Sequence, residues 1–214
     1  MIGDKLLITE YHRKSAAVIF KILQEKLKDL ETPVVVTVAG ESGCGKSETA
    51  AVLAELCADA GNNALILQQD DYFVYPPKTN HNKRLENINR VGPQEVKLDT
   101  IEKNIADIKK GDTAVITKPL VIFDDDRITE ETVAVDEITV VIVEGTYTTI
   151  LKNADLKAFI NRDYRQTKKS RLARSRDSAT AFLEKVLSIE HEIISEHKKL
   201  ADIIIPPPEN ENAV

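Results

Sequence analysis

A glycine-rich stretch carries the pattern Gly40-x-x-x-x-Gly45-Lys46-Ser47, which is the Walker A motif of phosphate-binding loops. Glycines let the backbone turn tightly and bring its N–H groups close to phosphate oxygens. The lysine adds a positive charge near the β- and γ-phosphates, and the serine hydroxyl can bind Mg²⁺. An accidental match is expected in roughly one chain in a hundred of this length. The pattern therefore predicts a nucleotide phosphate site made by Gly40, Ser42, Gly43, Cys44, Gly45, Lys46, Ser47 and Glu48.

Carboxylates follow two other predicted strands. Asp70 comes after a predicted strand at residues 64–68, where it could act as a general base for an acceptor hydroxyl. Asp71 is its close competitor, and a turn or helix N-cap is the alternative role for this position. Glu144 ends an otherwise apolar strand, where a carboxylate is costly unless it is paired or binds a metal. We expect Glu144 and Ser47 to hold Mg²⁺, with a surface carboxylate as the alternative for Glu144.

A basic segment lies between residues 162 and 176. Arg171, Arg174 and Arg176 at this spacing could close over the phosphates as a lid and stabilise the transferred charge. The alternative is the solvated basic face of a helix. Arg171 is the predicted catalytic member, and Arg174 and Arg176 are predicted nucleotide contacts.

Other reactive residue types give weaker signals. The run from Asp124 to Asp126 favours a solvated turn over a metal site. His191 and His197 have no partner motif and are expected to be exposed on a helix. Cys44 is expected to be a small residue facing solvent, whereas Cys57 is expected in the core.

Strands alternate with helices along the chain. Residues 34–39 form the clearest buried strand, residues 138–143 the next, and helices are predicted at residues 2–30, 93–110 and 178–200. Residues 75–92 are polar and are expected to be loop-rich, and residues 114–135 are expected to contain a hairpin. This alternation predicts an α/β fold with a mostly parallel sheet covered on both faces. Ligands of such sheets bind at the carboxyl ends of the strands, so the phosphate loop, Asp70 and Glu144 should share one pocket.

Size and charge narrow the class of protein. The 214 residues suit a single domain, divided into an amino-terminal helical extension at 1–32, a lid at 164–178 and a flexible tail at 206–214. The net charge of −6 argues against a general nucleic-acid or membrane-surface binder. Without an apolar signal core or a membrane-span window, we expect a cytoplasmic location.

Five segments together resemble the uridine kinase and phosphoribulokinase family. The phosphate loop at residues 38–47 is similar to the family's loop, and residues 67–73 resemble its strand that ends in an aspartate followed by aromatics. Residues 140–145 resemble its apolar strand ending in Glu-Gly, residues 171–177 its arginine lid, and residues 197–206 its closing helix and strand. The ordered set is specific, although the loop alone is not.

The resemblance implies a three-layer P-loop fold with a short lid, and an ATP- and Mg²⁺-dependent kinase that phosphorylates a small-molecule hydroxyl. It assigns the base to Asp70, the metal to Ser47 and Glu144, and phosphate contacts to the lid arginines. Homo-oligomers are common in such a family. The chain reads Val91-Gly92-Pro93 where that family has Asp-His-Pro, so both nucleosides and sugars or polyols are considered as acceptors. The alternative function is a regulatory NTPase or nucleotide-binding module without a small-molecule acceptor.

Overall fold

A parallel sheet forms the centre of the protein. The computed structural model describes residues 6–29, 33–168, 171 and 180–208. Within these residues, five parallel strands lie in the order β2-β5-β1-β6-β7. Their bounds are β1 Val34–Gly40, β2 Ala64–Gln68, β5 Val140–Gly145, β6 Leu156–Ile160 and β7 Ile203–Ile205. This arrangement confirms the predicted α/β fold with a parallel sheet.

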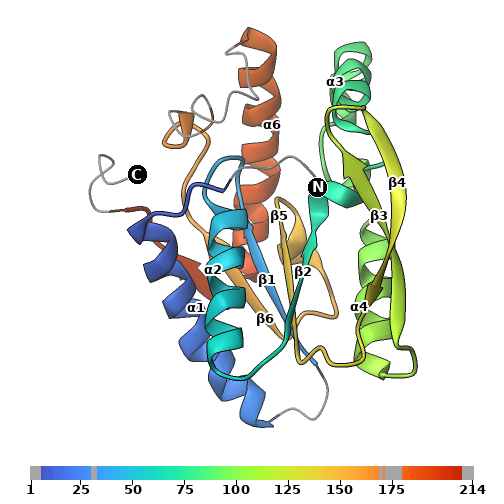
Figure 1. Ribbon diagram of the computed structural model, residues 1–214. Coiled ribbons are helices and arrows are strands. Elements are labelled where there is room, and N and C mark those ends of the chain that lie inside the picture. Colours follow the sequence, from blue (N-terminus) through green and yellow to red (C-terminus); the bar gives the residue numbers. More distant parts are fainter. Residues whose placement is uncertain (1–5, 30–32, 169–170, 172–179, 209–214) are drawn as a thin grey trace.

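Helices cover both faces of this sheet (Figure 1). Successive side chains of a strand point to opposite faces, and β1 follows this rule. Val34, Val36 and Val38 pack into one apolar cluster with residues of α1 (Glu10–Asp29) and α2 (Lys46–Asp59). Val35 and Ala39 pack into the other, with residues of α4 (Leu98–Lys110) and α6 (Ala181–His197). Both faces of β1 are therefore buried, which explains its run of β-branched residues.

A separate antiparallel hairpin lies beside the sheet. Strands β3 (Val115–Ile122) and β4 (Arg127–Ala134) pair with each other and form a second sheet among the described residues. The predicted hairpin at 114–135 is thus present. The turn between its strands contains the three consecutive aspartates.

Residues 77–86 differ from the sequence-based expectation, because they form helix α3 (Pro77–Glu86) instead of a loop. The carboxylate of Asp126, in the hairpin turn, accepts hydrogen bonds from the backbone N–H groups of Lys78 and Thr79, at 2.7 and 3.1 Å, and from the Thr79 hydroxyl at 2.6 Å. A carboxylate at a helix amino terminus satisfies N–H groups that have no partner within the helix. The polar sequence of α3 is therefore stabilised from outside the helix, and Asp126 is a helix-capping residue in addition to a turn residue.

Short 3-10 helices complete the connections. They are η1 (Gln69–Tyr72), η2 (Ile88–Arg90), η3 (Pro93–Glu95), η4 (Thr148–Ile150) and η5 (Lys198–Leu200). The helix predicted from residue 93 thus begins as a 3-10 turn, and the α-helix starts at Leu98. None of the helices in the described part of the chain combines the length and apolar character that crossing a bilayer requires.

Helix α1 is integrated with the domain and reaches the phosphate loop. Ala16, Ile19 and Leu23 are fully buried in the cluster that α1 shares with α2 and β1. The Tyr11 hydroxyl donates to the carbonyl oxygen of Pro206, 3.0 Å away, beyond β7. The His12 ring lies directly against Gly45, where its Nε2 atom is 2.5 Å from the position a Cβ would occupy. The last glycine of the loop is therefore required by close packing as well as by its φ of 100°.

The burial of α1 leads to a stability prediction. We expect Leu23→Ala to lower the free energy of unfolding by about 2–5 kcal/mol, because it removes a buried leucine and leaves a cavity. The matched control is Val18→Ala on the same helix, whose residue is 49% exposed and whose change should stay within about 0.5 kcal/mol. Urea denaturation measures both. Equal midpoints for the two variants would show that α1 does not contribute to the folded core.

Candidate functional site

The strand register brings the predicted site residues to one edge of the sheet. Glu144 on β5 lies beside Val38 on β1 and beside Gln68 on β2 in the same row. The phosphate loop begins at the end of β1, and η1 with Asp70 follows β2 directly. Three segments that are far apart in the sequence therefore meet at the carboxyl ends of neighbouring parallel strands.

The phosphate loop has the backbone shape that its glycines allow. Gly43 and Gly45 have φ values of 75° and 100°, in the region that residues with side chains rarely adopt. Helix α2 begins at Lys46, so its first N–H groups and the positive end of its dipole lie at the loop. The Lys46 ammonium donates to the carbonyl oxygen of Glu41 at 3.0 Å, across the loop. The N–H groups at the start of α2 and the Lys46 ammonium are thus placed where an anion could bind.

Cys44 occupies the interior of the loop, so the expectation that it faces solvent is wrong. Its side chain is fully buried, and its Sγ atom lies 2.7 Å from where a Cβ on Gly40 would be. Burial raises the pKa of the Cys44 thiol. Only the backbone of Cys44 remains as a group that could contact a phosphate. Cys57 is buried in the core, as predicted.

The side chains of Ser47 and Glu144 lie together beside the phosphate loop. The Ser47 hydroxyl donates to Glu144 Oε1 at 3.1 Å, and Glu144 is 4% exposed. Among the described residues, no group of three or more His, Cys, Asp or Glu side chains could hold a metal ion. Mg²⁺ typically binds through one or two protein oxygens together with phosphate oxygens and water. The Ser47–Glu144 pair fits that mode.

The two neighbouring aspartates of η1 have different environments. Asp70 is exposed at the edge of the sheet. Asp71 is 1% exposed, where its Oδ1 accepts from the Val121 N–H at 3.0 Å and its Oδ2 from the Lys118 ammonium at 3.0 Å. Lys118 also pairs with Glu131 of β4. Asp71 therefore attaches the β3–β4 hairpin to η1, and Asp70 is the carboxylate that an acceptor could reach.

Gly145 lets η1 approach β5. A Cβ at Gly145 would lie only 2.3 Å from the Cβ of Gln69. The Gln69 side chain uses this space, and its Oε1 accepts from the Tyr147 N–H at 2.7 Å. The Glu-Gly sequence thus combines a possible metal ligand with a contact that positions the Asp70 segment.

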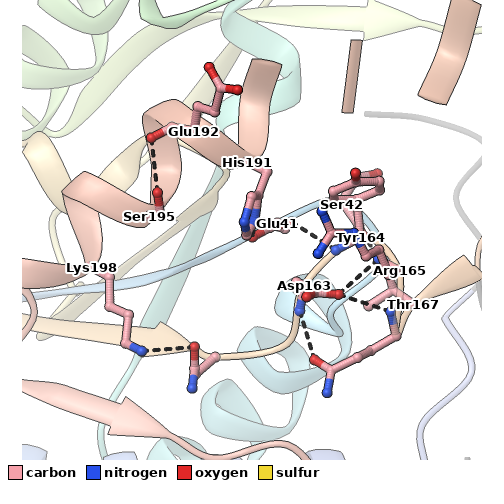
Figure 2. A network of polar contacts seen from close by, with 12 residues as sticks. Glu41, Ser42, Asp163, Tyr164, Arg165, Thr167, His191, Glu192, Ser195 and Lys198 are labelled. Atoms are coloured by element: carbon pink, nitrogen blue, oxygen red, sulfur yellow. Dashed lines mark hydrogen bonds and ion pairs between the residues drawn. The ribbon is translucent and has the colours of Figure 1, made fainter. Parts of the chain in front are cut away.

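A polar network holds the phosphate loop against α6 and the segment after β6 (Figure 2). Glu41 Oε1 lies 2.7 Å from His191 Nδ1, and Glu41 Oε2 accepts from the Tyr164 N–H at 2.8 Å. The Thr167 hydroxyl donates to the carbonyl oxygen of Ser42 at 2.8 Å. His191 is therefore a partner of the loop, which corrects the expectation of an isolated exposed histidine.

Arg171 lies against this network. It is 5% exposed, and its Nη1 donates to the carbonyl oxygen of Tyr164 and, at 2.7 Å, to the Thr167 hydroxyl. Its Cγ lies 2.6 Å from where a Cβ on Gly43 would be. In this conformation Arg171 packs against the phosphate loop at Gly43. Arg174 and Arg176 lie outside the described residues, and so does most of the predicted lid.

Sequence reasoning missed Glu41, His12 and His191 as partners of the loop. Glu41 occupies a variable position of the Walker A pattern, and its contact with His191 joins residues 150 positions apart. No local spacing encodes such a pair. The helical pattern around His191 gave its secondary structure but not the neighbour of that helix face.

Comparisons with known proteins find related sequences among kinases. The chain is 26% identical over 189 residues to the bifunctional alpha-galactosidase/sucrose kinase AgaSK of Mediterraneibacter gnavus, covering 82% of this chain and 20% of that protein. It is 30% identical over 136 residues to the uridine kinase of Ureaplasma urealyticum serovar 10, covering 61% of this chain and 63% of that protein. Both relatives are thus matched over less than two thirds of their own length.

The fold comparison gives the same class. The structure of phosphoribulokinase from Rhodobacter spheroides has a TM-score of 0.64 at 14% identity, covering 86% of this chain and 75% of that chain. The model of the phosphoribulokinase / uridine kinase family matches residues 35–207, from β1 to the residues after β7. This match contains the phosphate loop, η1 with Asp70, and β5 with Glu144. The chain therefore belongs to the phosphoribulokinase / uridine kinase family of P-loop kinases.

Proposed function

We propose that the protein transfers the γ-phosphate of ATP to a hydroxyl group of a small molecule, either a nucleoside or a sugar or polyol. Members of the family are kinases that phosphorylate hydroxyl groups. The observation that carries the proposal for this chain is the meeting of the phosphate loop, the Ser47–Glu144 pair and Asp70 at one edge of the sheet.

Each residue has a role that follows from its chemistry. Phosphoryl transfer needs charge neutralisation and an oriented nucleophile. Lys46 and the amino terminus of α2 supply positive charge to the phosphates. Ser47 and Glu144 would hold Mg²⁺, which when bound neutralises charge between the β- and γ-phosphates. Asp70 accepts the proton of the acceptor hydroxyl, because it is the exposed carboxylate of η1.

An acceptor panel tests the proposal. The protein is incubated with ATP and Mg²⁺ and with nucleosides, sugars, sugar phosphates, hydroxy acids or polyols, and ADP and new phosphoesters are measured. We expect ADP formation to depend strongly on one class of acceptor. Steady ATP hydrolysis that no acceptor accelerates would instead indicate a regulatory NTPase, and ATP binding without turnover would indicate a nucleotide-binding module.

Replacing the proposed base should slow the chemical step. We expect Asp70→Asn to lower kcat by about 10²–10⁴-fold, because the amide cannot take a proton, with little change in the KM for ATP. Asp125→Asn, at an exposed position of the hairpin turn, is the control and should retain full activity. Asp71→Asn should mainly destabilise the fold, since Asp71 pairs with Lys118. Full turnover by Asp70→Asn would refute the assignment of the base.

Replacing the proposed metal ligand should change the magnesium requirement. Glu144→Gln removes a negative charge beside Ser47, so we expect the Mg²⁺ concentration for half-maximal activity to rise about 10–100-fold. Glu137→Gln, an exposed residue just before β5, is the control. Titration of Mg²⁺ at saturating ATP measures the effect. An unchanged magnesium dependence in the Glu144 variant would show that this carboxylate does not serve the metal.

A further inference from the structure

A second charged cluster, made by Arg84, Glu95 and Glu190, joins α3, η3 and α6. Arg84 donates through Nε and Nη2 to the two carboxylate oxygens of Glu95, both at 2.8 Å. Its Nη2 also donates to Glu190 Oε1 at 2.9 Å. The Glu95 side chain is 1% exposed, whereas those of Arg84 and Glu190 remain 15% and 12% exposed. The outer groups of the cluster are therefore the ones that a ligand could touch.

The elements that form the cluster are connected to both parts of the proposed active site. On one side, the carbonyl oxygen of Glu95 accepts from the Val74 N–H at 2.8 Å, which pairs η3 with the segment that follows Asp70. On the other side, His191, the residue after Glu190, contacts Glu41 of the phosphate loop at 2.7 Å. Figure 1 shows α3 at the same end of the molecule as the carboxyl ends of the strands. An acceptor must lie between the base and the phosphate loop, and these contacts join the cluster to the segments that carry both.

Two buried polar groups around the cluster have no hydrogen-bond partner among the described residues. One is the hydroxyl of Tyr147, a residue only 1% exposed, and the other is Oδ1 of Asn80, a residue 6% exposed. The Asn80 Nδ2 donates to Glu95 at 3.1 Å, so its amide lies at the cluster. Burial is the main cause that raises the pKa of the Tyr147 hydroxyl, and the charge of Glu190 raises it further. The hydroxyl also interacts electrostatically with Arg84 and Glu95. A buried polar group without a partner is costly, so both groups are suited to a ligand hydroxyl.

The two carboxylates of the cluster, Glu95 and Glu190, accept different numbers of hydrogen bonds. Glu95 accepts hydrogen bonds from Arg84, from Asn80 and, at 3.1 Å, from the Gly92 N–H. Among the described residues Glu190 accepts one hydrogen bond, from Arg84, and burial raises the pKa of its carboxyl group. Arg84 donates to both carboxylates, and Lys46 of the phosphate loop also acts electrostatically on Glu190. The cluster therefore has no net positive charge of its own to attract a carboxylate or phosphate on the acceptor, whereas neutral hydroxyls can donate to Glu190.

We propose that Arg84, Glu95 and Glu190, together with Tyr147, form the acceptor subsite, and that it selects neutral polyhydroxylated acceptors over acceptors bearing a carboxylate or phosphate. Glu190 accepts hydrogen bonds from acceptor hydroxyls, and Tyr147 donates to an acceptor oxygen. Arg84 and Glu95 are positioning residues that hold Glu190 in place. The inference rests on the proposed kinase function and names the acceptor class for that same site.

Binding measurements test the subsite without requiring turnover. Calorimetry is carried out with a non-hydrolysable ATP analogue and Mg²⁺ present, and it compares three series of ligands. The first series contains neutral sugars, polyols and nucleosides. The second contains the matching hydroxy acids, and the third contains the matching sugar phosphates. We expect a neutral ligand to bind at least about 10-fold more tightly than its charged counterparts. Glu190→Gln should lower the affinity for the neutral ligand about 10-fold, because a hydrogen bond to a charged group is lost. The difference in affinity between the neutral ligand and the matching acid should therefore become smaller. Tyr147→Phe should lower the affinity for the neutral ligand by a smaller factor.

A control variant and a second readout separate this role from a structural one. Glu192→Gln changes an exposed residue of α6 close to Glu190 and should alter neither acceptor binding nor nucleotide affinity. If Arg84 and Glu190 only join α3 to α6, Glu190→Gln will lower the melting temperature and leave acceptor affinity unchanged, which would overturn the proposal. Tighter binding of acids or phosphates by the unaltered protein, or binding of no ligand series, would also overturn it.

The outcomes distinguish the subsite from the proposed function. Transfer of phosphate from ATP to a carboxylate- or phosphate-bearing acceptor would support the kinase function and refute the subsite. Binding of neutral polyols that depends on Glu190, without any ATP-dependent phosphoester, would support the subsite and refute the kinase function.

Discussion

The parallel pairing of β5 with β1 and β2 is the constraint on which the site depends. It sets Glu144 in the same row as Val38 and Gln68, so the two connections that leave β1 and β2 begin beside this carboxylate. The hydrogen bond from Ser47 to Glu144 can form only because this register places the start of α2 next to the end of β5. A shift of one residue would turn Glu144 to the other face of the sheet and put Val143 or Gly145, neither of which can bind a metal through its side chain, in its place.

Buried polar contacts then fix the segments that leave the sheet. Asp71 binds Lys118 and the Val121 N–H, and Gln69 lies against Gly145, so η1 is held from two sides and Asp70 is left at the edge. Glu41 does the same for the phosphate loop through His191 and Tyr164. Such contacts are costly to break, because removal of one partner leaves the other buried without its hydrogen bond. They are well suited to hold loops that must meet a charged ligand with a defined geometry.

The apolar elements could be predicted from the sequence with good success, because burial leaves a periodic pattern. The β-branched runs at β1 and β5 and the apolar spacing of α4 identified these elements, and the parallel sheet followed from their alternation with helices. Helix α3 could not be predicted in this way, since its sequence is polar and its amino terminus is capped by Asp126, 48 residues away from Lys78. The tertiary structure likewise decides that α1 packs against α2 and β1, because an amphipathic pattern shows that a face is buried but not what covers it.

The residues of the site likewise divide into those that the sequence predicts and those that only tertiary contacts bring together. Residue types at short spacing determined the phosphate loop, and the strand ends suggested which carboxylates belong near it, because backbone geometry and charge act locally there. Only the tertiary structure decided that Asp71 is buried while Asp70 is exposed, that His12 packs on Gly45, and that Arg84, Glu95 and Glu190 meet. These outcomes depend on contacts between residues tens to more than a hundred positions apart. A sequence records each partner of such a contact, but the packing of helices and strands on the sheet decides which partners meet.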